Sequence, residues 1–112
     1  MNGKAFIPRQ ATLAFWLLIG MVVWFAHEMV WDNQVPFYRD LGPYFYPMRF
    51  SLAQSFAAGE LPLWDRSMAM GFPLLANFQS GVFYPPHLFL LVLPFFSAMR
   101  AIFFFHYLVA AI

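Results

Sequence analysis

The sequence predicts an all-α integral membrane protein, from its apolar composition and from two long segments that carry almost no charge. Of its 112 residues, 62% are hydrophobic, 22% are aromatic and only 10% are charged. Soluble domains carry roughly 25% charged residues, and a chain this short leaves much of its surface exposed to the surrounding solvent. We therefore expect lipid to be the solvent for much of the chain.

The first uncharged segment predicts a transmembrane helix over residues 11–31. ATLAFWLLIGMVVWFA, residues 11–26, has no charge, and extension to Trp31 supplies the roughly 20 residues that a bilayer core of about 30 Å needs. The alternative is a cleaved signal peptide whose basic start is Lys4 and Arg9. It is disfavoured because the apolar run is long and no A-x-A-like cleavage site follows.

Lys4 and Arg9 lie in the tail of residues 1–10, and no acid precedes the expected span. By the positive-inside rule this tail is cytoplasmic, so residues 32–97 are expected to form an extracytoplasmic loop. Eight of the nine prolines follow the expected span, and together with glycines they predict a series of turns. Lipid cannot satisfy the free backbone groups of such a segment.

Within this loop, residues 47–58 (PMRFSLAQSFAA) predict a helix. Pro47 suits the first turn and Gly59 suits the position just past the end. Met48, Leu52 and Phe56 form one apolar stripe, which predicts a helix lying along the membrane surface. A helix packed on other spans would use the same stripe, so that alternative stays open.

From residue 87 onward Arg100 is the only charged side chain. A single long span would bury it at a high cost in free energy. We instead expect an interfacial helix over residues 86–94, ended by Pro94, and the start of a second span over residues 98–112. That second segment is too short to cross, which predicts a fragment of a longer, multi-span protein. A small membrane protein complete at Ile112 is the alternative.

Four stretches, RDLGPYFYPMRFSL, AAGELPLWD, MGFPLLANFQSGVFYPP and FFHYLVAAI, resemble the N-terminal region of the bacterial YfhO-like family, membrane proteins related to GT-C glycosyltransferases. The resemblance covers residues 32–112. It implies a multi-pass protein of the bacterial cytoplasmic membrane that transfers sugar from a polyprenyl-phosphate-linked donor to an envelope polymer such as lipoteichoic acid. The implied partners are membrane lipid, that donor and the remaining spans, without which this part is expected to be inactive.

Sugar transfer from a lipid phosphate needs a carboxylate near the acceptor hydroxyl and positive charge at the departing phosphate. The resemblance implies that Asp40 is the catalytic acid or base. The family often has Gly-Asp at this point, whereas here Arg39 stands in place of the Gly. A solvated loop carboxylate paired with Arg39 is the alternative, and Asp32, eight residues away, makes no local acid pair for a metal.

Four residues are expected to bind substrate: Arg39, Trp64, Tyr84 and Arg100. Arg100 suits a bidentate contact with a lipid phosphate, although anchoring at the membrane interface explains it as well. Trp64 and Tyr84 could line a sugar or prenyl groove or belong to an interfacial aromatic belt. The sequence indicates no particular cofactor.

Among the other polar residues, Asp65 is expected to form a local ion pair with Arg66, and His106 to make a helix–helix contact. The lack of clustered Lys and Arg argues against a nucleic-acid partner, and the lack of Cys excludes thiol chemistry. The competing function is a non-catalytic membrane scaffold or transporter subunit. The two hypotheses differ in whether Asp40 is needed for glycosylation.

Overall fold

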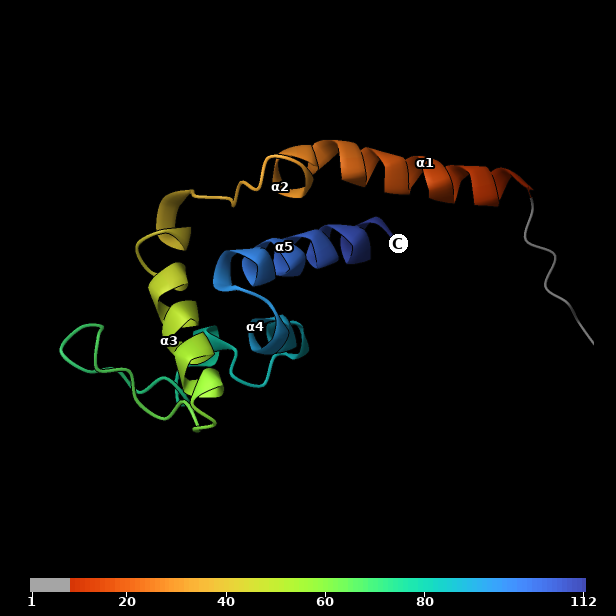
Figure 1. The fold of residues 1–112 in the computed structure, drawn as a ribbon. Coiled ribbons are helices and arrows are strands. Elements are labelled where there is room, and N and C mark those ends of the chain that lie inside the picture. The colour runs from red at the N-terminus through yellow and green to blue at the C-terminus, as the bar shows by residue number, and fades with distance from the viewer. Residues whose placement is uncertain (1–8) are drawn as a thin grey trace, which may run out of the picture.

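The computed structural model describes residues 9–112, which fold as α- and 3₁₀-helices joined by irregular loops (Figure 1). In chain order the elements are α1 (Arg9–Phe25), α2 (His27–Val30), η1 (Arg39–Leu41), α3 (Phe45–Ala57), η2 (Phe78–Ser80), η3 (Pro85–Leu88), α4 (Phe89–Val92) and α5 (Phe95–Ala111). In Figure 1, α1 and α5 run alongside each other, and α3 lies beyond the first turns of α5.

The predicted integral membrane fold is wrong, because none of the helices in residues 9–112 is both long enough and apolar enough to cross a membrane. The expected first span divides at Ala26 (φ −91°, ψ 14°) into α1 and α2. Both α1 and α5 have 17 residues, a length of about 26 Å, and a bilayer core measures roughly 30 Å. The expected start of a second span, residues 98–112, falls almost entirely within α5.

The core forms where α3 packs against α4 and α5. Met48 and Leu52, one turn apart on α3, are both fully buried. They meet Ala98 and Ile102 of α5, while Phe56 packs against the edge of this cluster. The apolar stripe predicted within residues 47–58 is therefore present on α3, and it packs against the interior of the protein.

Helix α1 contributes no buried residue to this core. It contacts α5 near its end, where the rings of Phe25 and Tyr107 meet edge to face with centroids 5.4 Å apart. Most of the other large side chains of α1 remain exposed, including Trp16 and Trp24. The folded core therefore depends on α3, α4 and α5 far more than on α1.

The loop between α3 and η2 is held by an isolated antiparallel bridge in which Asp65 and Phe72 exchange two backbone hydrogen bonds of 2.8 Å each. Gly71 beside it has φ +119°, a value that L side chains rarely adopt. A Cβ at Gly71 would lie 2.8 Å from Nε1 of Trp64. Glycine at position 71 therefore lets the backbone pack directly against the indole ring of Trp64.

Replacement of Leu52 by Ala should lower the free energy of unfolding by about 2–5 kcal/mol, because it leaves a cavity in the fully buried cluster. The control is Leu61→Ala, at a leucine that is 70% exposed, which should change the free energy of unfolding by less than about 0.5 kcal/mol. Urea denaturation followed by circular dichroism measures both. Equal effects of the two variants would contradict this placement of the core.

Candidate functional site

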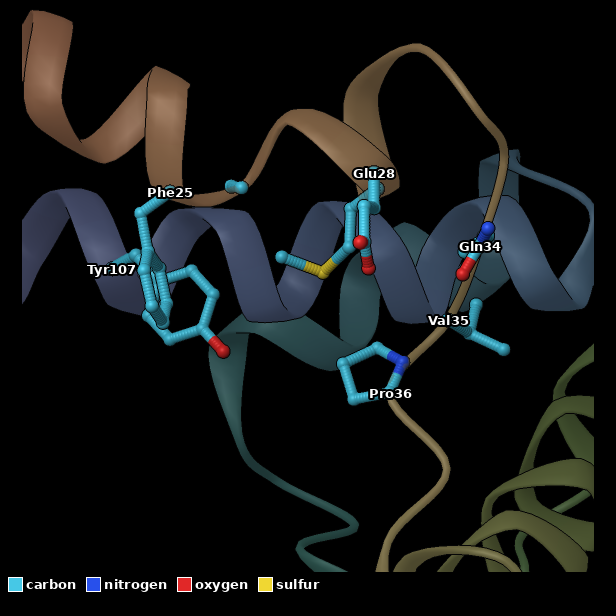
Figure 2. Close-up of a pocket in the computed structure, with 8 residues that line it drawn as sticks. Phe25, Glu28, Gln34, Val35, Pro36 and Tyr107 are labelled. Atoms are coloured by element: carbon cyan, nitrogen blue, oxygen red, sulfur yellow. The ribbon is translucent and has the colours of Figure 1, made fainter.

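One cavity, of about 220 Å³, lies between the α1–α2 junction and α5 (Figure 2). Figure 2 shows Phe25 and Tyr107 against each other at one end and Glu28 and Gln34 toward the other. Its lining includes the carboxylate of Glu28 and no Lys, Arg or His. This cavity therefore does not suit the anionic phosphate that the sequence predicts as a ligand.

A different cavity, of about 360 Å³, lies among α3, η3 and α5. Its walls are largely apolar, and four polar side chains interrupt them: Arg49, Tyr84, His87 and His106. We refer to it as the Arg49 cavity. No carboxylate lines it, so it carries a cation without an acidic partner in its walls.

Arg49 is fixed by its own helix and by the η2 turn. Its Nη1 donates to the carbonyl oxygens of Gln79, at 3.2 Å, and of Ser80. Among residues 9–112, Nη2 and Nε make no hydrogen bond, which leaves them available to a ligand. Burial of the guanidinium lowers the pKa of Arg49, and Tyr84 partly offsets this effect; an arginine nevertheless stays protonated in proteins.

His87 is buried, with 2% of its surface exposed, and its Nδ1–H donates to the carbonyl oxygen of Gly81 at 2.6 Å. Gly81 has φ +60°, and a Cβ there would lie 2.9 Å from Cε1 of His87. Burial, aided by the charge of Arg49 and opposed by the Gly81 bond, lowers the pKa of His87 to about 4. His87 is therefore a neutral imidazole at pH 7.

Tyr84 and His106 form a hydrogen-bonded pair at the mouth of the cavity. Nδ1 of His106 lies 2.6 Å from the carbonyl oxygen of Ile102 and donates to it, so Nε2 is left to accept from the Tyr84 hydroxyl. The Tyr84 ring also meets His87 edge to face, with centroids 5.3 Å apart. The hydroxyl of Tyr84 is thereby positioned from two elements.

Tyr84 also borders a second hollow, of about 490 Å³, which we call the Pro86 groove. Its other lining residues are Pro85, Pro86, Leu88, Phe89 and Phe105, none of them charged. Tyr84 therefore lines both the Arg49 cavity and the Pro86 groove.

Of the residues predicted to act on substrate, the structure brings Tyr84 to the Arg49 cavity. Asp40 is exposed on η1, and the next residue, Leu41, lines the cavity. The Arg39 guanidinium lies over the Tyr38 ring, 5.5 Å from its centroid.

Two further predicted residues lie elsewhere. Arg100 donates to the side chains of Asn33 and, at 3.0 Å, of Ser97, and so is engaged away from the cavity. Trp64 lines a separate polar cavity with Asp65 and Arg66. In place of the expected ion pair with Arg66, the Asp65 carboxylate accepts hydrogen bonds from Ser67.

Sequence reasoning missed Arg49 and His87 as site residues and gave His106 a structural role. The available signal was weak: Arg49 is a single cation within an otherwise uncharged helix, and His106 follows three phenylalanines. Their convergence depends on a contact between α3 and η2 that joins residues about 30 positions apart.

Searches against protein-family models, curated proteins and solved structures give no match to this chain. The resemblance to YfhO-like proteins therefore stays a prediction.

The free energy of unfolding should fall as pH falls from about 6.5 to about 4, because His87 in the folded state has a pKa of about 4, below the value of about 6.5 in the unfolded chain. Between these values the unfolded state binds more protons, which destabilises the fold. The full effect is about 3 kcal/mol.

The replacement His87→Asn, which keeps a donor for Gly81, should remove most of this slope in urea denaturation at a series of pH values. His27→Asn, at an exposed histidine, is the control and should retain it. An unchanged slope in His87→Asn would assign the pH dependence to another group.

Proposed function

We propose that this chain binds an amphiphile with a phosphate head, and that the ligand is a polyprenyl-phosphate-linked sugar that serves as donor in glycosyl transfer. The observation that carries the proposal is the position of Arg49: a cation in a largely apolar cavity, without an acidic partner in its lining, next to an uncharged groove.

A phosphate head group would supply the counter-charge that Arg49 lacks in its surroundings. A partly buried cation that bonds only to carbonyl groups lacks a counter-charge, and desolvation without one is costly. A phosphate would supply that charge and accept from the free Nη2 and Nε in the bidentate manner that guanidinium favours. The Tyr84 hydroxyl offers a further donor if it turns from His106.

The apolar part of the ligand fits the Pro86 groove. Burial of a hydrocarbon chain contributes about 0.8 kcal/mol for each CH₂ group removed from water. Tyr84 borders both spaces, so one molecule could place its phosphate beside Arg49 and its prenyl chain along Pro86 and Phe89. A free nucleotide sugar would leave this groove unused.

In sugar transfer, Arg49 would stabilise the negative charge that develops on the departing lipid phosphate. Asp40, exposed one residue from the cavity wall, remains the proposed base for the acceptor hydroxyl. The proposed setting is the surface of the bacterial cytoplasmic membrane, where such donors reside, and the proposed acceptor is an envelope polymer.

Arg49→Gln should weaken the binding of polyprenyl phosphate by tenfold to about a hundredfold, since hydrogen bonds to charged groups contribute about 1.5–3 kcal/mol. Arg39→Gln, an exposed arginine on η1, is the matched control and should bind as the unaltered chain does. Detergent-solubilised polyprenyl phosphate, titrated against the chain and followed by tryptophan fluorescence, measures both affinities.

The uncharged alcohol polyprenol distinguishes the contribution of the phosphate to the affinity from that of the prenyl chain. Its affinity should be equal for Arg49→Gln and the unaltered chain, because the prenyl chain occupies the groove alone. If Arg49→Gln is poorly folded by circular dichroism, Arg49→Lys keeps the charge without the bidentate fork and should lose less than Arg49→Gln. Equal binding of the phosphate by Arg49→Gln and Arg39→Gln would refute the assignment.

Asp40→Asn should reduce sugar transfer in the natural protein by about a hundredfold or more, the usual contribution of a general base. It should leave the affinity for polyprenyl phosphate unchanged, because Asp40 does not line the cavity. Transfer of radiolabelled sugar from the lipid donor in isolated membranes measures the rate. Persistent transfer would remove Asp40 from the mechanism, and donor binding without any transfer would favour a non-catalytic scaffold.

A further inference from the structure

The polar cavity that Trp64 lines, of about 360 Å³, lies on the other side of α3 from the Arg49 cavity. From α3 it is lined by Ser51, Gln54 and Ser55, which are two, five and six positions after Arg49. At about 100° per residue these positions project from the face of the helix opposite Arg49. We refer to this hollow as the Trp64 cavity.

The loop after α3 closes the Trp64 cavity with an aromatic ring. The Trp64 side chain is 58% exposed, yet one part of it is in close contact with the backbone at Gly71, where an added Cβ would lie 2.8 Å from Nε1. The Nε1 edge of the indole is thus held against Gly71, while much of the ring surface remains free. A supported, exposed ring is a platform for a ligand that has an apolar face.

The rest of the lining can accept and donate hydrogen bonds around that platform. Asp65 is 5% exposed, and its Oδ1 accepts from the amide nitrogen and the hydroxyl of Ser67 at 2.7 and 2.6 Å. Burial raises the pKa of Asp65, but hydrogen bonds led by the Ser67 hydroxyl outweigh this and hold its pKa below the usual value. Asp65 is therefore a carboxylate at neutral pH.

The second carboxylate oxygen of Asp65, Oδ2, is buried and has no hydrogen bond within residues 9–112, while Ser51 and the backbone of Met68 also help to lower the pKa of Asp65. The hydroxyls of Ser51 and Ser67, which also line the hollow, lie 3.4 Å apart. Glu60, a second carboxylate, and the amide of Gln54 also line the space.

We infer that the Trp64 cavity binds one pyranose residue of a neutral saccharide. A pyranose has a C–H face, whose slight positive charge complements the negative face of an indole, and a rim of hydroxyl groups that need acceptors and donors. The lining supplies both. Its volume lies within the range of about 300–1,000 Å³ that is typical of small-molecule sites.

The charge of the lining selects against acidic sugars. Glu60 and Asp65 contribute two negative charges and Arg66 one positive charge, so the cavity is net negative. A uronic acid or a sugar phosphate would be repelled, whereas a neutral hexose would not. The inference does not depend on lipid-phosphate binding, because the two cavities lie on different faces of α3.

The test is a titration of the full chain with methyl glucoside, methyl galactoside, N-acetylglucosamine, glucuronate and glucose 6-phosphate. Binding is followed by the nuclear magnetic resonance signals of the indole N–H groups, assigned through single Trp variants. We expect at least one neutral sugar to shift the Trp64 signal saturably, and the two acidic sugars to bind at least tenfold more weakly.

Trp64→Phe and Gln54→Ala should each weaken binding of that sugar at least threefold, with Trp31→Phe, at an exposed tryptophan outside the cavity, as the control. Gln54 is exposed, so its replacement should not disturb folding. For the Gln54 variants the sugar is followed by the Trp64 signal, and for Trp64→Phe by saturation transfer to the sugar protons.

No saturable shift with any neutral sugar, stronger binding of the acidic sugars, or an equal loss in Trp31→Phe would each overturn the inference. The affinity of Trp64→Phe for polyprenyl phosphate should stay unchanged. Failure of saccharide binding is thereby separated from failure of the donor-lipid proposal.

Discussion

The contact of the α3 stripe with α4 and α5 is the constraint on which the rest of the structure depends. Met48 and Leu52 are fully buried in it, and they fix both the depth and the rotation of α3. The rotation of α3 in turn fixes the direction in which its other side chains project. Arg49 must face η3 and α5, and Ser51 must face the loop that follows the helix.

The sequence allowed the helices to be predicted where periodicity is strong. The stripe on residues 47–58 marked α3, and Gly59 marked its end, because spacing and helix-end residues are local properties. Apolar composition was a poorer guide. It predicted spans across a bilayer, whereas the break at Ala26 and the 17-residue lengths of α1 and α5 depend on backbone geometry that composition does not encode.

The candidate site was less accessible, because its members are brought together by distant contacts. Tyr84 was assigned to substrate from its aromatic character, and it does line the Arg49 cavity. Arg49 and His87 could not be singled out, since neither has a charged or metal-binding neighbour at a recognisable spacing. From the sequence, Arg100 was expected to contact a lipid phosphate, but in the fold its guanidinium is occupied by hydrogen bonds to Asn33 and Ser97.

The two cavities beside α3 differ in the sign of their charge, and this difference has a consequence for ligand choice. Arg49 makes one lining positive, while Glu60 and Asp65 outweigh Arg66 in the other. The proposed lipid phosphate would match one side of the helix with its charged and apolar parts, and the proposed saccharide would match the other side with its uncharged hydroxyls. If the two proposals hold, the net negative lining of the Trp64 cavity disfavours the anionic lipid, and α3 keeps the lipid phosphate and the neutral sugar on opposite faces.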